Sequence, residues 1–430
     1  MVEQVSSLKT GIKYKNTPIG KIPVDWEINK IIDLASSKKY SYTGGPFGSD
    51  LKEDSYTDSG VRVIQLQNIG DGKFRDKYKI FTSEEKATQL KNCNIYPGDI
   101  IIAKMADPVA RACIIPNTDK RYLMASDGIR LSVDKEKYDT QFVLFAINSP
   151  LFRDIAEKHS TGTTRLRIGL TELRNLLIAI PPIKEQKKIA EILTTVDEAI
   201  EKTDQIIEKT KETKKGLMQK LLTRGINHKK FKKTEVGEIP FDWEVGKLSD
   251  IAYIIMGQSP PGNTYNIEGA GYPILNGPTE FTDYSPKPIQ FTTQPTKVCK
   301  AQDILFCVRG SSTGRMNIAD QEYCIGRGLA AIREKSISDT KYIYYILVSL
   351  TSTIFSEASG AGSTFPNIGR EALEATKITI PPPPEQKEIA DILSSIDDEL
   401  QREANHKKRL ELLKNGLMQV LLTGKVRVSM

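Results

Sequence analysis

Two stretches of the chain place apolar residues at alternating steps of four and three, the spacing of a coiled-coil helix face. The first seam runs Ile189, Leu193, Val196, Ile200, Thr203, Ile207, Thr210, Lys214, Leu217, Leu221. The second runs Ile389, Leu393, Ile396, Leu400, Glu403, Lys407, Leu410, Lys414, Leu417, Leu421. Both seams are apolar at their ends and polar in the middle. They predict two long helices that pair with each other, antiparallel because a globular segment separates them.

The helix starts are marked by proline. Pro181-Pro182 and Pro381–Pro384 block helix upstream, and Glu185 and Glu385 suit the positive end of the helix dipole. The first helix is therefore expected to span Lys184–Leu222.

The two helical stretches also share their letters at both ends. Glu185-Gln186-Lys187 and Gly216-Leu217-Met218-Gln219 return 200 residues later, whereas Glu201–Thr213 and Gln401–Leu413 share no residue. A spacer would need only the heptad, so one hypothesis is that the ends form two equivalent surfaces for two copies of one partner. The alternative is recent duplication with packing alone. The candidate partner-binding residues are Glu185, Gln186, Leu217, Met218, Glu385, Gln386, Leu417, Met418.

The segments between the helices have mixed patterns. A Gly-x-Ile-Pro-x-Asp-Trp segment ends at Trp26 and again at Trp243, and most simply anchors an extended strand by its tryptophan. Short apolar runs at Val61–Leu66 and Asp99–Lys104 predict strands. Helices are expected at Gln141–Asn148 and Leu151–His159, followed by a loop at Ser160–Arg167. The second half matches the first, element by element.

These patterns predict a mixed α/β, pseudo-two-fold chain in which two globular domains alternate with two long helices. A chain of 430 residues is also too long for one core. The expected boundaries are 1–178 for the first globular domain, 179–226 for the first helix, 227–378 for the second domain and 379–430 for the second helix.

Composition indicates where such a chain resides. The five cysteines include no C-x-x-C pair, so neither a zinc site nor a disulfide framework is indicated. No apolar run reaches the roughly 18 residues that a membrane span needs, and the first residues lack signal-peptide character. We expect a cytoplasmic protein with no membrane partner.

The net charge of +7 is unevenly distributed. The two helical stretches together carry about −1, so the rest of the chain carries about +8. Any binding of phosphates by this excess would come from the globular segments.

The sequence contains no complete catalytic motif. Gly424-Lys425 lacks the glycine spacing of a P-loop, and Ser259-Pro260-Pro261-Gly262 lacks the aromatic residue of an amino-methyltransferase motif. The acidic cluster Asp134-Lys135-Glu136-Lys137 is typical of a solvated turn, and the three histidines have no partners at ligand spacing. We expect no catalysis by this chain alone.

The duplicated Pro-Pro-x-x-Glu-Gln-Lys-x-Ile-Ala-x-Ile-Leu and Gly-Leu-Met-Gln-x-Leu-Leu-Thr, with the two tryptophan segments, resemble the DNA-specificity (S) subunit of type I restriction–modification enzymes. Gly45-Pro46-Phe47-Gly48-Ser49 and Gly362–Ile368 also look like that family. The resemblance covers nearly the whole chain.

The resemblance implies that each globular domain is a target recognition domain that reads one half of a bipartite site in double-stranded DNA. The helices would fix the unread gap and dock two methyltransferase subunits, and ATP-dependent restriction subunits would join. S-adenosylmethionine, ATP and Mg²⁺ would belong to those partners, with no cofactor in this chain.

Base reading needs side chains with paired donors and acceptors on loops that reach a groove. The first-domain candidates are Ser49, Lys104, Arg111, Thr163, Thr164, Arg165, Arg167. The second-domain candidates are Gln258, Asn263, Asn276, Arg309, Ser311, Ser312, Arg315, Ser363, Thr364, Asn367. For any one of them, a turn-forming or phosphate-only role is an equal alternative. The halves differ at Thr163–Ile168 and Ser363–Ile368, so they should read different sequences.

Two other functions stay open on the residues alone. One is a structural adaptor whose helices join partner proteins, which would not need basic Gly/Ser/Asn/Arg loops. The other is a divergent nuclease or methyltransferase, which would bind S-adenosylmethionine or cleave DNA by itself.

Overall fold

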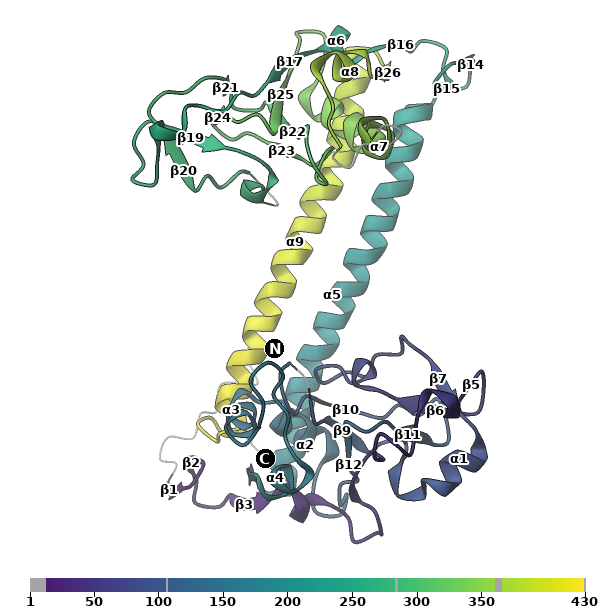
Figure 1. Cartoon of the computed structure of the whole chain (residues 1–430), viewed down its shortest axis with the longest axis vertical. Coiled ribbons are helices and arrows are strands. Elements are labelled where there is room, and N and C mark those ends of the chain that lie inside the picture. The colour runs from purple at the N-terminus through teal and green to yellow at the C-terminus, as the bar shows by residue number, and fades with distance from the viewer. Residues whose placement is uncertain (1–12, 106, 283–284, 360–365, 429–430) are drawn as a thin grey trace. The chain divides into compact units, whose positions relative to one another are not determined.

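A computed structural model describes residues 13–105, 107–282, 285–359 and 366–428 (Figure 1). The chain forms two compact units. The first consists of residues 1–203 and 406–430, and the second of residues 204–405. Each unit contains a globular part and two helix segments, one from α5 (Ile183–Arg224) and one from α9 (Pro383–Leu421). The predicted first helix is thus confirmed to within two residues at each end.

In the first unit, two sheets form the globular part. The four-stranded sheet has the order β10-β9-β12-β4 and the five-stranded sheet the order β5-β7-β6-β11-β8. All neighbours are antiparallel except β6 and β11, which pair in parallel with Arg62 opposite Tyr122. The strands are β4 (Tyr42–Gly44), β5 (Tyr56–Thr57), β6 (Val61–Ile64), β7 (Ile80–Thr82), β8 (Asn94–Ile95), β9 (Ile100–Ala103), β10 (Ala112–Ile114), β11 (Tyr122–Met124) and β12 (Gly128–Leu131).

The second unit repeats this topology. Its sheets have the orders β17-β25-β22-β23 and β18-β20-β19-β24-β21, and β19 and β24 are its parallel pair. The repeat therefore extends to every strand of the two sheets. The strands are β17 (Ala252–Met256), β18 (Tyr265–Asn266), β19 (Tyr272–Leu275), β20 (Gln290–Thr292), β21 (Val298–Cys299), β22 (Ile304–Cys307), β23 (Met316–Ile318), β24 (Tyr323–Ile325) and β25 (Leu329–Glu334).

Smaller elements connect the sheets to the long helices. Each unit has an N-terminal hairpin and a two-stranded sheet that pairs the strand after the tryptophan with the strand before the long helix. In the first unit these are β1 (Tyr14–Thr17) with β2 (Gly20–Pro23), and β3 (Glu27–Lys30) with β13 (Leu177–Ile180). In the second they are β14 (Phe231–Thr234) with β15 (Gly237–Pro240), and β16 (Glu244–Lys247) with β26 (Lys377–Ile380). β13 and β26 end at Ile180 and Ile380, close to the boundaries at 178 and 378, which stay predictions.

The shorter helices differ between units at one place. The predicted pair of helices is present as α2 (Thr140–Ile147) and α3 (Pro150–Lys158), whereas the second unit has one helix, α7 (Thr340–Ser359). The break between α2 and α3 is explained by Ser149 and Pro150. The Ser149 side chain caps α3 by accepting from the Phe152 amide, and Pro150 is favoured in the first turn of a helix. The remaining helices are α1 (Glu84–Gln89), α4 (Leu170–Asn175), α6 (Leu248–Ile251) and α8 (Arg370–Ala375).

The long helices pack antiparallel within each unit. In the first unit, Ile189 and Leu193 of α5 share a buried core with Met418 and Leu421 of α9. Polar residues of the helices also contribute to this pairing. Lys414 of α9 forms an ion pair with Asp197 of α5, with 2.6 Å between Nζ and Oδ1.

The second unit repeats this pairing with the helices exchanged. Lys214 Nζ of α5 lies 2.5 Å from Asp397 Oδ1 of α9. The Asp397 carboxylate also accepts from the Tyr345 hydroxyl at 2.7 Å. The predicted coiled-coil seam therefore has a lysine–aspartate pair where its apolar residues run out.

At the base of α5 in the first unit, Glu185 is fully buried and accepts three hydrogen bonds. Trp26 Nε1 donates at 3.1 Å, and Arg427 donates from Nε at 2.6 Å and from Nη2 at 2.7 Å. Arg427 also holds both carboxylate oxygens of Asp25. Hydrogen bonds to Asp25 and Glu185 raise the pKa of the Arg427 guanidinium. The C-terminal residues thus fix the tryptophan segment to the start of α5.

Glu385 of the second unit has the same role with different partners. It accepts from Trp243 Nε1 at 2.8 Å and from the Ile226 amide at 2.9 Å, and His228 Nε2 lies 2.8 Å away.

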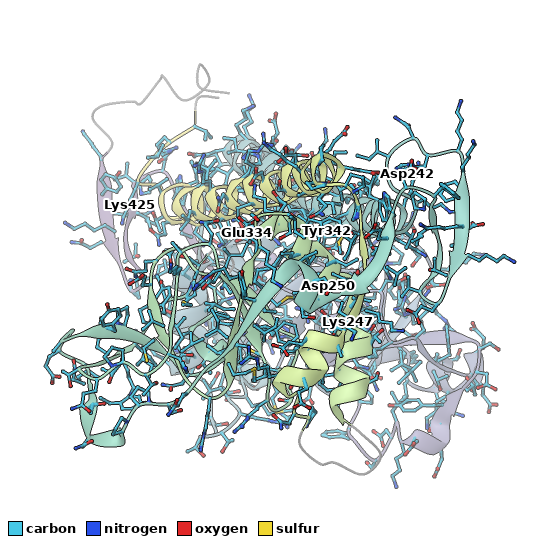
Figure 2. The ribbon with its side chains drawn as sticks, turned by 90° about the horizontal axis from the view of Figure 1, so that it is seen from above. Asp242, Lys247, Asp250, Glu334, Tyr342 and Lys425 are labelled. Carbon is cyan, nitrogen blue, oxygen red and sulfur yellow. The ribbon has the colours of Figure 1, made fainter. Side chains whose placement is uncertain are left out.

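Two further contacts fix strands of the second unit beside this site. The buried hydroxyl of Tyr342 donates to the Thr379 carbonyl of β26 at 2.9 Å. Asp250 caps α6 by accepting from the Lys247 amide at 2.7 Å (Figure 2).

Removing the Glu185 carboxylate should unfold the first unit more easily. Glu185→Ala leaves the Arg427 guanidinium and the indole N–H of Trp26 without their acceptor in a buried site. We expect the free energy of unfolding to fall by about 3 kcal/mol. Urea titration followed by circular dichroism measures it. Glu191→Ala is the matched control, because its pair with Lys188 is exposed and should contribute less than about 0.5 kcal/mol. Equal losses from both variants would contradict this account.

Candidate nucleic-acid interface

Corresponding loops of the two units carry most of the candidate DNA-binding residues. In the first unit these loops follow β4, β6, β9 and β11, and the segment before α4 joins them. In the second unit they follow β17, β19, β22 and β24, and the segment before α8 joins them. Strand register and backbone hydrogen bonds make Met105 equivalent to Arg309, Arg167 to Asn367 and Asp127 to Gly328.

In the first unit the loops meet at Lys104 and Arg167. The Ile168 amide donates to the Lys104 carbonyl at 2.9 Å, and the Lys104 amide donates to the Asp127 carbonyl at 2.8 Å. The Lys104 amine is half-buried and donates to the Ser126 carbonyl at 2.9 Å. Burial first, and then the charge of Arg167, lowers the pKa of Lys104. Lys104 therefore supports the loops from within, although it was predicted to contact DNA.

Arg167 is more exposed and pairs with an acid. Its Nη2 lies 2.9 Å from Asp127 Oδ1, with side-chain exposures of 52% and 20%. Asp127 was not among the predicted residues, because nothing in the sequence links it to Arg167.

An open hollow of about 310 Å³ lies beside this pair. Its walls include Gln65, Gln67, Ser126 and Asp127, and Phe47 stands at its edge with 83% of its surface exposed. Gln65 directly follows β6, as the predicted Asn276 directly follows β19. That correspondence was the signal that could have found Gln65.

The other first-unit candidates divide into exposed and structural residues. Ser49, Thr163, Thr164 and Arg165 are exposed. Arg111 instead donates to the carbonyls of Leu66 at 3.0 Å and Asp107 at 3.2 Å, and burial lowers the pKa of its guanidinium. These donors tie two loops of the unit together, and a DNA contact of Arg111 stays a prediction.

In the second unit, Arg309 and Asn367 face each other. They form a β-bridge and, with Gly310 and Pro366, line an open hollow of about 500 Å³. Gln258, Asn263, Ser311 and Arg315 are exposed, whereas Ser312 and Asn276 are half-buried. Asn276 packs against Gly326, where a Cβ would lie 2.7 Å from its Oδ1. The predicted Ser363 and Thr364 lie outside the described residues.

The predicted partner-binding residues at the helix ends have internal roles. Glu185, Gln186 and Gln386 are buried, and Gln186 Oε1 accepts from the Asp139 amide at 2.9 Å. Glu385 is 14% exposed and fully engaged as described above. The remaining four pack against the cores: Leu217, Met218, Leu417 and Met418. The structure therefore contradicts docking through the glutamate–glutamine pairs, because their polar atoms are already bonded within the chain.

Other repeated residues remain exposed and lack such a packing role. In the first unit they are Lys187, Gly416 and Gln419. In the second they are Lys387, Gly216 and Gln219. Each unit thus presents the start of one repeat beside the end of the other. Identity at exposed positions in both copies was the signal that could have identified them.

Within the described part of the chain, no group of three or more His, Cys, Asp and Glu residues is placed to hold a metal ion. All five cysteines are buried free thiols. Among the described helices, none is both long and apolar enough to cross a membrane.

Comparison with known proteins gives concordant matches along the chain. A family profile described as the type I restriction modification DNA specificity domain matches residues 23–212 and 240–412. The MjaX type I restriction enzyme specificity subunit of Methanocaldococcus jannaschii is 35% identical over 426 residues, 97% of each chain. The MjaVIII specificity subunit of that organism is 29% identical over 95% of each chain.

Solved structures share the fold. An S subunit of a type I restriction–modification system from M. genitalium gives a TM-score of 0.59 at 17% identity, covering 96% of this chain and 97% of that one. A chain from a structure of type I R-M complex assembly also gives 0.59, at 22% identity, with 94% and 99% covered. The predicted mixed α/β fold with two repeated domains is thus confirmed.

The structural role of Arg111 can be separated from DNA contact. Arg111→Ala removes the side-chain hydrogen bonds to the Leu66 and Asp107 carbonyls, and should lower the free energy of unfolding by about 1–3 kcal/mol. Arg165→Ala, at an exposed position of the same unit, should change it by less than about 0.5 kcal/mol. Thermal unfolding of both variants measures the difference. An unchanged melting temperature for Arg111→Ala would show that these hydrogen bonds are dispensable.

Proposed function

The chain belongs to the type I restriction–modification DNA specificity family, and on that premise we propose that it selects the DNA target of such a complex. Each globular part reads one half of a bipartite sequence. The observation that carries the proposal is a single nine-strand scaffold built twice, with different side chains at equivalent loop positions such as Arg167 and Asn367. A common scaffold with different loops is what reading two different half-sites requires.

The charge distribution supports DNA as the ligand. The helical stretches are nearly neutral, so the excess of about +8 belongs to the rest of the chain. Basic loops attract the phosphate backbone and orient the protein, while paired donors and acceptors distinguish bases. An adaptor that only joined proteins would not require exposed Arg309, Arg315 and Asn367 on its loops.

The helices serve the assembly of the complex. α5 is one uninterrupted helix from Ile183 to Arg224, which suits an element that fixes the unread gap. Two methyltransferase subunits dock on the exposed repeated residues, one on Lys187, Gly416 and Gln419 and one on Lys387, Gly216 and Gln219. We assign docking to these exposed residues instead of the predicted glutamate–glutamine pairs, whose polar atoms are bonded within the chain.

The chain itself is a non-catalytic subunit. The methyltransferase subunits supply S-adenosylmethionine chemistry, and restriction subunits supply ATP-dependent cleavage with Mg²⁺. The names of the relatives, which are specificity subunits, support this division.

The docking surfaces can be blocked one at a time. A Cβ on Gly416 or Gly216 would meet nothing within 4 Å, so an arginine fits there without disturbing the fold. Gly416→Arg should remove one methyltransferase copy from the assembled complex, and adding Gly216→Arg should remove the second. Native mass spectrometry counts the copies. Thr213→Arg, in the exposed unmatched middle of α5, should leave both in place. Full assembly by the double variant would place docking elsewhere.

Exchange of one recognition domain tests the reading function itself. Replacing residues 38–177 by the corresponding domain of another family member should change one half of the methylated sequence and leave the other half intact. Sequencing of methylated adenines in a host that expresses the chimera with its methyltransferase gives the result. A change in both halves would contradict independent reading, and binding of the native complex to every duplex equally would refute target selection.

A further inference from the structure

The backbone on both sides of the Arg167 side chain is fixed. Its amide donates to the Thr161 carbonyl at 2.9 Å, and its carbonyl accepts from the Thr161 amide at 2.9 Å. Arg167 also forms a bridge with Met105, and the next amide, that of Ile168, donates to Lys104. Because the backbone is constrained in this way, the position from which the Arg167 side chain extends is defined.

The guanidinium also forms an ion pair at its far end. Asp127 Oδ1 lies 2.9 Å from Nη2, and the Asp127 carbonyl is itself bound by the Lys104 amide. A guanidinium has five N–H donors in a planar fork, so one carboxylate contact leaves most of the fork unused. With 52% of the side chain exposed, those donors face solvent.

A carboxylate in this place argues against a simple phosphate contact. Asp127 lines the 310 Å³ hollow together with the side chains of Gln65, Gln67 and Ser126. An acidic side chain repels the phosphate backbone, which makes it costly in a surface that serves only to attract DNA. An acid that restrains an arginine removes side-chain freedom before binding, which favours directional hydrogen bonds.

We infer that Arg167 is a specificity-determining residue that reads a guanine in the first half-site, and that Asp127 is a positioning residue that holds its fork. The inference rests on the proposed function. A bidentate contact of arginine with guanine O6 and N7 is the commonest specific contact in the major groove. Arg167 supplies the charge and the fork, and Asp127 supplies the restraint.

The second unit lacks this arrangement at the same place. The residue equivalent to Arg167 is Asn367, and the one equivalent to Asp127 is Gly328, which has no side chain. An arginine is present across the bridge, at Arg309. The requirement for this guanine is therefore confined to the first half-site, although both units share one scaffold.

The test pairs a protein change with a change of one acceptor atom. After the target is mapped, each guanine of the first half-site is replaced in turn by 7-deazaguanine, which lacks the N7 acceptor. The native chain, assembled with its methyltransferase, should lose about tenfold in affinity at one guanine. Arg167→Ala removes every donor of the side chain, so it should bind the two duplexes equally. Arg121→Gln, at another ion pair of the same unit, should respond as the native chain does.

The role of Asp127 has its own readout. Asp127→Asn should reduce discrimination at the same guanine, and Asp127→Glu should restore it, with every other position unchanged. If Asp127→Asn lowers the melting temperature but keeps discrimination, Asp127 is only structural and the positioning role is wrong.

Other outcomes overturn the reading role of Arg167. They are a first half-site without guanine, insensitivity to every 7-deazaguanine, an Arg167→Ala variant that stays sensitive, and an equal loss on all duplexes, which marks a phosphate contact. If the native complex prefers no sequence in either half, the proposed function fails instead, and the two failures are distinct.

Discussion

The structure depends on a carboxylate buried at the start of each long helix. A buried charge is costly unless it is paired and hydrogen-bonded, so Glu185 and Glu385 require donors from several segments at once. The tryptophan segment supplies one in each unit, through Trp26 and Trp243. In both units the rest come from residues that follow the other long helix: Arg427 after α9 in the first, and Ile226 and His228 after α5 in the second. One carboxylate therefore fixes the hairpin segment, the helix start and a helix end together.

This constraint explains repeats that looked like separate motifs in the sequence. In each unit three repeated residues pack together: the glutamate, the tryptophan and the glycine that follows a long helix. Gly225 and Gly424 both have positive φ, and a Cβ on either would approach the tryptophan ring, at 2.8 Å and 3.3 Å. The duplicated lysines and aspartates of the helices form the inter-helix pairs Lys414–Asp197 and Lys214–Asp397. Much of the identity between the halves thus serves folding, and only its exposed part is available for partners.

The sequence was sufficient for the helices, the tryptophan anchors and the doubled α/β scaffold, because periodicity and repetition report directly on burial. It was insufficient for the polar residues, because the partner of a polar side chain is set by tertiary structure. Arg111 and Arg167 look alike in the sequence, yet one ties loops together and the other faces solvent. Glu185 looked like an exposed first-turn acid because its partner Arg427 lies more than 200 residues away. Asp127 was not among the predicted residues for the same reason.

The loop junctions of the two units are built from chemically different residues. The first has Lys104, Arg167 and Asp127 at its loop junction, whereas the second has Val308, Asn367 and Gly328 at the equivalent positions and carries its arginine on the opposite strand of the bridge. The strand order of the sheets is unchanged, so the scaffold tolerates exchange of the arginine–aspartate pair for an asparagine and a glycine. Tolerance of that kind requires that the loop charges contribute little to the core, and the four-stranded sheets and their cores are built from apolar residues in both units. Separation of a hydrophobic scaffold from a polar junction is what allows the junction to diverge while the fold is retained.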